Sequence, residues 1–383
     1  MTRLTDLLGV KFPLIQAGMA GGPTTPELVA AVCNAGALGT LGAGYLSPDE
    51  LRDAIRAVRR MTDRPFAVNL IKTSPVDADG PAVMRAQERL AAIRRRLGLP
   101  QVQAAPHGLP GHAGQSGLAP QPGQEPPPGS ESQKSPEFTA RLSVVLEEAP
   151  PVLSFTFDLL SAAEFQALAA RKICILGTAT SVREAVRLEQ AGVDAIVAQG
   201  SEAGGHRGTF LGDFESSMVG TLSLVPQVCA RVTVPVVAAG GVMDGRGLAA
   251  VLALGADGVQ MGTAFLTCTE AGTNAVHREA ILQGTDVSTV VTKAFTGRPA
   301  RGIRNQFMAE IDPHSADILP YPLQNQLTRD IRSRAAELSD ASNMSLWAGQ
   351  SLALARDEGA AALVQRVMEE YKTAVAKLPR DLS

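Results

Sequence analysis

The sequence predicts an α/β fold, a (β/α)8 TIM barrel with a mainly helical C-terminal substrate-side domain. Eight short apolar runs alternate with amphipathic helical patterns up to residue 266. The runs are almost continuously apolar, as expected for parallel strands that are buried on both faces. After residue 266 the helical patterns continue without strand partners. An open doubly wound sheet is the alternative arrangement of the same elements.

The eight predicted strands are rich in β-branched and small apolar residues and lie between turn signals. They comprise residues 13–18, 37–44, 66–71, 152–157, 172–179, 195–200, 235–241 and 258–265. The loops between strands and helices are short, which favours a closed barrel over an open sheet.

Cap signals mark the starts of the intervening helices. Ser47 precedes a proline and stands three residues before Glu50, which is the pattern of a capping box. Thr25 repeats the order of cap and proline, and Ser181 and Asp244 are further expected N-caps. Glycine follows several of these helices, as is usual at a C-cap.

The predicted barrel spans residues 1–266 and is interrupted once. Residues 101–134 contain seven prolines and six glycines, so we expect a flexible insertion there after the third strand. Residues 267–350 are expected to form the substrate-side domain, joined through an extended piece at 290–305. Residues 351–383 are expected to add a C-terminal helix that packs back on the barrel.

The composition limits the classes of function. A net charge of −3 gives no broad basic surface, so nucleic acid is not an expected partner. No apolar run approaches the roughly 18 residues of a membrane span, and we predict a cytoplasmic protein without membrane contact. The four cysteines are far apart, and His107 and His112 lack further ligands at metal spacing. Neither a disulfide nor a metal site is predicted.

The strongest functional signal is the stretch AGGHRG at residues 203–208, directly after the sixth predicted strand. The carboxyl ends of the strands form the working face of a TIM barrel. His206 is therefore expected at that face, among glycines that let a large flat group approach the backbone. A glycine-rich turn with a surface histidine is the alternative interpretation.

The ends of the last two predicted strands indicate a phosphate site. Gly240 and Gly241 end the seventh strand, and backbone amides after the seventh and eighth strands form the recurrent phosphate site of TIM barrels. No Walker-type motif occurs, so a nucleotide triphosphatase is disfavoured. The corresponding residues of the eighth strand are Gln260, Met261, Gly262 and Thr263.

A phosphate site beside a glycine-lined shelf suits flavin mononucleotide (FMN), because the isoalloxazine ring is planar and needs close backbone contact. The first strand ends at the same mouth in residues of little bulk, Gly18, Met19 and Ala20. The third strand contributes Asn69, whose amide can bond ring nitrogen or oxygen atoms. A strand-end cap is the simpler alternative role for Asn69.

Several segments together resemble the class I nitronate monooxygenases, formerly called 2-nitropropane dioxygenases. The resemblance implies an FMN-dependent TIM barrel that oxidises alkyl nitronates with molecular oxygen, characteristically propionate 3-nitronate. The implied products are an aldehyde or ketone plus nitrite or nitrate, formed by single-electron transfer through a flavin semiquinone. The segments are residues 15–22, 202–210, 236–245, 258–266, 294–305, 320–325 and 346–350.

The resemblance also implies roles for single residues. His206 would be the catalytic histidine beside the flavin ring, and Gly241 with residues 260–263 would hold the phosphate end. Lys293 and Arg207 are candidate charge partners for an anionic tail of the substrate, and Tyr321 is a candidate lining residue. The implied contacts to the ring and ribityl chain are Met19, Asn69, Gln199 and Gly204.

The chain departs from the family pattern at two places. Gly18 replaces the usual proline of the first motif, and Thr156 replaces a frequent histidine, which leaves the substrate preference open. An FMN-dependent enoyl-acyl-carrier-protein reductase and an NAD(P)H:quinone reductase are the alternative activities, and a non-catalytic flavin-binding protein is the third class. The expected partners are a small-molecule substrate and oxygen, in a monomer or homodimer.

Overall fold

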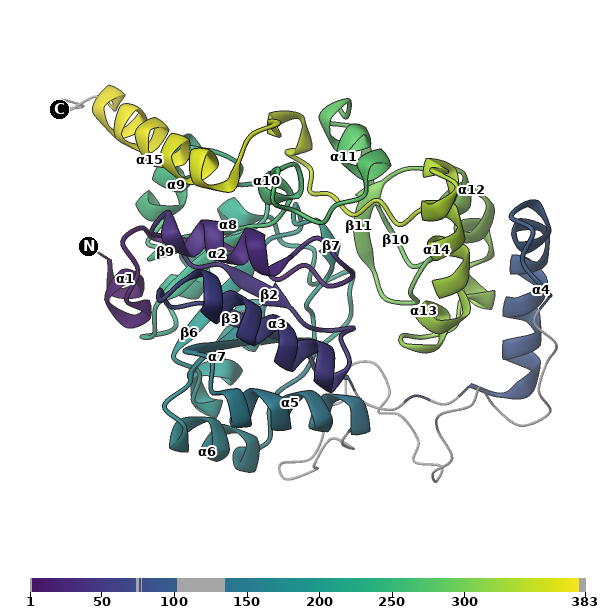
Figure 1. The fold of residues 1–383 in the computed structure, drawn as a ribbon, viewed down its shortest axis with the longest axis horizontal. Helices are drawn as coiled ribbons and strands as arrows, with labels where there is room; N and C mark the ends of the chain where they lie inside the picture. The colour runs from purple at the N-terminus through teal and green to yellow at the C-terminus, as the bar shows by residue number, and fades with distance from the viewer. Residues whose placement is uncertain (1, 74–75, 77, 102–134, 379–383) are drawn as a thin grey trace.

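The computed structural model describes residues 2–73, 76, 78–101 and 135–378. All of the predicted insertion after Gln101 lies outside these residues. The predicted TIM barrel is confirmed, with eight parallel strands surrounded by helices (Figure 1).

The barrel strands follow the order β1-β9-β8-β6-β5-β4-β3-β2, and each lies within its predicted range. Pairing of Ile15 with Leu38, just before β2, brings the two ends of the sheet together. The strands are β1 Leu14–Gln16, β2 Thr40–Gly42, β3 Ala67–Ile71, β4 Val152–Thr156, β5 Cys174–Ala179, β6 Ala195–Gln199, β8 Val236–Ala239 and β9 Gly258–Met261.

Helices cover the outside of the barrel, and their predicted caps are confirmed. The Ser47 hydroxyl accepts the Glu50 N–H, and the Glu50 carboxylate accepts the Ser47 N–H at 2.7 Å. Side chains of Thr25, Ser181 and Asp244 cap their helices as expected. The helices are α2 Pro26–Asn34, α3 Pro48–Met61, α5 Pro136–Glu148, α6 Ala162–Ala170, α7 Val182–Ala191, α8 Thr221–Cys229 and α9 Gly245–Ala253.

A short helix closes the amino-terminal end of the barrel. Leu4 and Leu8 of α1 (Arg3–Leu8) are buried in one apolar cluster with inward side chains such as Ile15, Val197 and Val237. Because this end is filled by packed side chains, the open end of the barrel is the one at which the strands finish.

The C-terminal part forms a second body beside the barrel. It contains α11 Ala275–Leu282, α12 Gln306–Ile311, α13 Leu323–Leu327 and α14 Arg329–Glu337. Its apolar cluster also includes Leu90 and Ile93 of α4 (Gly80–Arg96), a helix that the sequence places within the 1–266 barrel. Figure 1 shows α4 standing beside α12–α14, away from the barrel.

Two strands in this part were not expected from the sequence. β10 (Thr289–Thr292) and β11 (Ala300–Ile303) form an antiparallel hairpin within the segment predicted to be merely extended. β11 also pairs with β7 (Gly205–His206), which comes from the barrel. This three-stranded sheet therefore joins the two bodies at the histidine loop.

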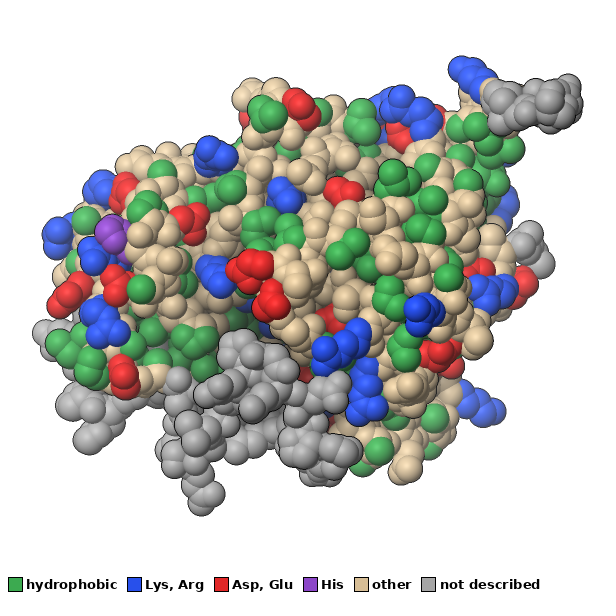
Figure 2. Space-filling view, turned by 180° about the vertical axis from the view of Figure 1, so that it is seen from behind, with side chains coloured by type: hydrophobic (Ala, Val, Ile, Leu, Met, Phe, Trp, Pro, Cys, Tyr) green, Lys and Arg blue, Asp and Glu red, His purple; other side chains and the backbone are tan. Residues whose placement is uncertain are grey.

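The last helix, α15 (Ala360–Lys377), packs along α9 and α2, and its buried residues belong to the main barrel cluster. Figure 2 shows acidic and basic side chains interspersed over one face of the molecule. Among the described helices, none is both long enough and apolar enough to cross a membrane.

Candidate functional site

A cavity of about 600 Å³ lies at the carboxyl ends of the strands, between the barrel and the second body. Strand ends and the loops after them form one side, while residues of α11, α14 and the segment 344–351 form the other. The predicted site residues that line it are Gly18, Met19, Ala20, Asn69, Gln199, Gly204, His206, Gly240, Gly241, Gln260, Gly262 and Thr263.

Four predicted site residues do not line the cavity, namely Met261, Lys293, Tyr321 and Arg207. Met261 is 1% exposed, and its carbonyl accepts the Ala17 N–H at 2.9 Å, which ties β9 to β1. The Lys293 side chain is exposed to solvent in the turn after β10. The Tyr321 ring lies against His206, with ring centroids 5.9 Å apart, and so supports the cavity wall from behind.

His206 is enclosed by aromatic rings although the residue as a whole is half-buried. The ring centroids of Phe157, Tyr321 and Trp347 lie 5.7, 5.9 and 5.5 Å from that of the imidazole. Burial lowers the pKa of His206 to about 3, and the positive charges of Arg298 and Arg332 act in the same direction. The imidazole is therefore neutral near pH 7.

Buried polar groups hold the backbone of the histidine loop. The Gln199 side chain donates to the His206 carbonyl at 3.1 Å and accepts the Gly208 N–H at 2.8 Å. Arg207 donates to the carbonyls of Gln199 and Ser217, and burial lowers its pKa to about 10. Arg207 is thus a brace of the loop, and its guanidinium does not point at the cavity as a partner for an anion.

The glycines of this loop lie against different neighbours. A Cβ on Gly204 would lie 2.6 Å from the backbone of Ala348 and Gly349, so this glycine admits the segment 344–351. A Cβ on Gly208 would lie 2.9 Å from the Thr178 side chain. Gly205 has φ +72° and meets no atom within 4 Å of its Cβ position, so it alone of the three combines a left-handed backbone with open space.

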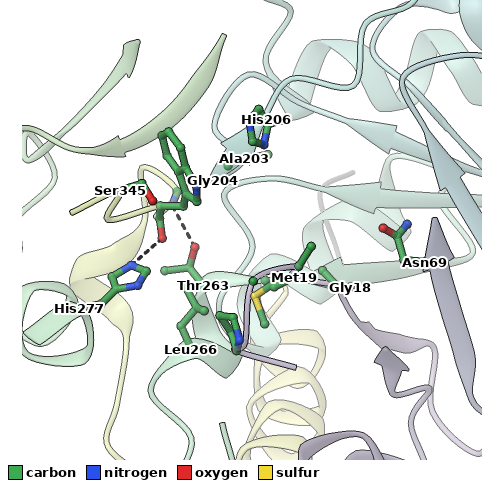
Figure 3. Close-up of a pocket in the computed structure, with 18 of the residues that line it drawn as sticks. Gly18, Met19, Asn69, Ala203, Gly204, His206, Thr263, Leu266, His277 and Ser345 are labelled. Atoms are coloured by element: carbon green, nitrogen blue, oxygen red, sulfur yellow. Dashed lines mark hydrogen bonds between the residues drawn. The ribbon is translucent and has the colours of Figure 1, made fainter. Parts of the chain in front are cut away.

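Gly18 allows the first and third strands to approach each other at the cavity. A Cβ on Gly18 would lie 2.5 Å from the Asn69 Cβ, which no real pair of side chains tolerates. Asn69 donates its amide N–H to the Ser154 hydroxyl at 2.8 Å, and this bond orients the amide. In Figure 3, Gly18 and Met19 lie between Asn69 and His277.

The ends of β8 and β9 offer backbone N–H groups to the cavity. In the described part of the chain, no protein acceptor meets the N–H groups of Gly241 and Gly262. The neighbouring helix starts are already satisfied, because Glu202 accepts the Thr221 N–H at 2.9 Å and Asp244 caps α9. The free N–H groups can therefore bind an anionic group at the strand ends.

The segment 344–351 covers this end of the cavity. The Gly349 N–H donates to the Thr263 hydroxyl at 2.9 Å (Figure 3), and the Gln350 N–H donates to the Glu202 carbonyl at 2.9 Å. Ser345, Trp347 and Ser351 of this segment line the cavity. The second body thus contributes directly to the site.

A family model described as nitronate monooxygenase matches residues 1–370. The chain belongs to the nitronate monooxygenase family. A probable nitronate monooxygenase of Staphylococcus saprophyticus subsp. saprophyticus is 43% identical over 96% of this chain and 97% of its own length. A probable nitronate monooxygenase of Staphylococcus aureus is 42% identical over 96% of each chain. The protein is accordingly an oxidoreductase.

Solved structures show the same fold. A nitroalkane oxidase from Streptomyces ansochromogenes has a TM-score of 0.84 and 38% identity, covering 99% of this chain and all of that one. FabK from Thermotoga maritima has a TM-score of 0.73 and 31% identity, covering 99% of this chain and 98% of that one. The nitronate monooxygenase family thus shares its barrel with FabK.

Sequence reasoning missed several residues that line or support the site of this nitronate monooxygenase family member. Arg298 stacks on Phe157, with its guanidinium carbon 3.7 Å from the ring centroid, and Thr296 bonds His206. Both lie in the segment 294–305, which was recognised as a motif but given no role. Arg332 and His277 line the cavity from helical patterns that carried no further signal.

Proposed function

We propose that the protein binds FMN in the cavity and oxidises alkyl nitronates with molecular oxygen, with propionate 3-nitronate as the characteristic substrate. The expected products are the aldehyde or ketone plus nitrite or nitrate. The observation that carries this proposal is a neutral, enclosed His206 that faces a cavity rimmed by strand ends with free backbone N–H groups.

The cavity suits the two ends of FMN. We assign the phosphate to the strand ends with free N–H groups, around Gly241 and Gly262, since an anion there gains hydrogen bonds from the backbone. We assign the ring to the shelf of Gly18, Met19, Ala20 and Asn69. FMN supplies the electron acceptor for the substrate when bound.

A nitronate fits the charge state of the site better than a neutral nitroalkane does. The nitronate is already a carbanion equivalent, so its oxidation needs no strong base. With a pKa of about 3, His206 is a weak base because its charged form would be buried. We therefore expect nitronates to react faster than the corresponding nitroalkanes.

We assign to Arg332 the role that the sequence analysis gave to Lys293, that of a charge partner for an anionic substrate tail. Arg332 lines the cavity, is half-buried, and donates to the Asn325 side-chain oxygen at 2.7 Å. Among the described residues, no carboxylate forms an ion pair with Arg332. An uncompensated guanidinium at the cavity favours an anionic substrate, including one with a carboxylate tail.

An enoyl-acyl-carrier-protein reductase is the second candidate activity, and it would require NAD(P)H as the reductant. An NAD(P)H:quinone reductase would share that requirement. Dependence on a nicotinamide therefore separates both alternatives from nitronate oxidation, which needs none.

The deciding experiment is oxygen uptake by the purified yellow protein with propionate 3-nitronate and no nicotinamide. Rapid uptake with nitrite release is expected, and His206→Asn should lose most of it. His314→Asn is the matched control, since His314 is exposed and outside the cavity. No uptake by the wild type, together with bleaching of the flavin by NADPH, would instead establish a reductase.

A further inference from the structure

The His206 ring is held by a single side-chain hydroxyl. Its Nε2 atom lies 2.9 Å from Thr296 Oγ1. The same hydroxyl lies 3.1 Å from the Arg298 carbonyl oxygen and 3.4 Å from the Arg298 N–H. Thr296 is 1% exposed, so bulk water does not compete for these bonds. Thr296 thus has three protein partners for one proton and two lone pairs.

Only one arrangement of protons satisfies all three partners. If the hydroxyl donates to the Arg298 carbonyl, it can accept from the Arg298 N–H and from His206 Nε2–H. If it donates to Nε2 instead, the Arg298 carbonyl has no other donor among the described residues. A carbonyl shielded from water and left without a donor costs up to about 1–3 kcal/mol, and the Arg298 carbonyl is partly buried, so the first arrangement is favoured.

We infer that Thr296 is a positioning residue for His206, because its hydroxyl holds the imidazole in the Nε2–H tautomer and leaves Nδ1 as a hydrogen-bond acceptor. In the described part of the chain, no protein donor meets Nδ1. The groups that face the ring are Arg298, Arg332, Phe157, Tyr321 and Trp347, and none of them is acidic.

The tautomer determines what His206 can do for a substrate, and this consequence rests on the proposed function. Neutral Nδ1 can accept a proton or a hydrogen bond but cannot donate one to a nitronate oxygen. With a neutral nitroalkane, the α-carbon–hydrogen bond breaks, an Nδ1–H bond forms, and the electron pair remains on the nitronate. With a preformed nitronate, the cationic Arg332 is the group that meets the negative charge.

His277 provides an internal reference for the tautomer. Its Nε2 lies 3.0 Å from the Trp347 carbonyl oxygen, which can only accept, so His277 must carry its proton on Nε2. Both rings are neutral near pH 7, because burial lowers the pKa of His277 to about 4. His206 and His277 should therefore show the same nitrogen signature.

The test is two-bond proton–nitrogen NMR of protein labelled with nitrogen-15 histidine, in which His206→Asn assigns the His206 signals. Wild type should show His206 with the pattern of His277, and Thr296→Ser should retain it. Thr296→Val, which fills the same space without a hydroxyl, should shift both His206 nitrogens toward the average of the two tautomers. A wild-type His206 protonated on Nδ1, or an unchanged pattern in Thr296→Val, overturns the inference.

Kinetics provide the second measurement. Thr296→Val should lower kcat/KM for nitroethane by about tenfold or more, with a smaller effect on ethyl nitronate, because only the nitroalkane needs an acceptor for its proton. Thr296→Ser should restore most of the activity. Equal losses on both substrates would contradict the positioning role. The NMR result does not depend on turnover, so a protein that oxidises neither compound would refute the proposed function alone.

Discussion

Among the described residues, His206 and His277 are the histidines that line the cavity, and burial keeps both of them neutral. The sequence predicted His206 because glycines surround it at a strand end. His277 has no such neighbours in the sequence, and its place at the cavity depends on the packing of α11 against the segment 344–351. The local sequence therefore predicted the position of His206 at the cavity but not that of His277.

Burial of His277 makes stability depend on pH. Its folded pKa, about 4, lies below the unfolded value near 6.5, so the unfolded chain binds more protons in between. The contribution of His277 to the free energy of unfolding should therefore be fully present above pH 6.5. It should be lost as the pH drops toward 4, by up to about 1.4 kcal/mol per pH unit. Denaturant titrations of His277→Gln should show a shallower decline, and His314→Gln should retain the wild-type slope.

Arg332 is expected to select for charge on the substrate. Arg332→Met should raise the KM for propionate 3-nitronate by about tenfold or more, and raise that for ethyl nitronate less, because the former carries two negative charges. Steady-state oxygen uptake with both substrates measures this. Arg334→Met is the control on the same helix, since its guanidinium pairs with Glu337 at 2.9 Å. Equal effects on both substrates would mean that Arg332 does not bind the carboxylate tail of propionate 3-nitronate.

At the scale of elements, the site is built where a barrel loop joins a sheet of the second body. Gly205–His206 forms the edge strand β7 beside β11, with His206 opposite Ala300. The hairpin turn between β10 and β11 then places Thr296 against the histidine ring and Arg298 over the Phe157 ring. The sequence did not predict this sheet because β7 is only two residues long and gains its pairing from a segment more than 90 positions away.

The segment 344–351 is the second element that completes the site. Gly204→Ala should displace it, because the new methyl group would meet the backbone of Ala348 and Gly349 at 2.6 Å. We expect a loss of stability of about 1–3 kcal/mol and weaker FMN binding, measured by thermal unfolding and by flavin fluorescence titration. Gly80→Ala is the control, because its methyl group meets nothing within 4 Å. Wild-type flavin affinity in Gly204→Ala would show that this segment does not shape the cofactor end.

At the scale of the whole molecule, α4 links two parts of the chain that lie far apart in sequence. Its buried face packs with α12–α14, and Arg94 forms a two-bond ion pair with Asp330 at 2.6 and 2.9 Å. The Phe295 and Phe307 rings stack at 4.3 Å inside the same cluster. The body that covers the barrel mouth therefore has its own core.

Substitutions in the core of the second body should lower the stability of the protein. Ile93→Ala should reduce the free energy of unfolding by about 2–5 kcal/mol, since Ile93 is fully buried. Met84→Ala, at an exposed position of the same helix, should change it little. Chemical unfolding of both variants, followed by the fluorescence of Trp347 in the second body, measures the difference. Similar losses in the two variants would mean that α4 does not depend on this packing.

The sequence by itself determined the barrel strands, the helix caps and the position of His206 at a strand end. These features depend on apolar periodicity and on neighbours within a few residues, so a single chain reveals them. It also placed most of the glycine-rich strand ends at one face, since parallel strands of a barrel finish together.

Only the tertiary structure decided which residues meet His206 and which cations line the cavity. Lys293 and Arg332 are both cationic, and the sequence does not show which of them lies at the cavity. Lys293 is exposed to solvent, whereas Arg332 lines the cavity. Thr296 reaches the imidazole because β7 pairs with β11, and α4 covers the C-terminal helices although it follows a barrel strand. The physical reason is that periodicity marks the buried face of an element, whereas the partner of that face depends on contacts between distant parts of the chain.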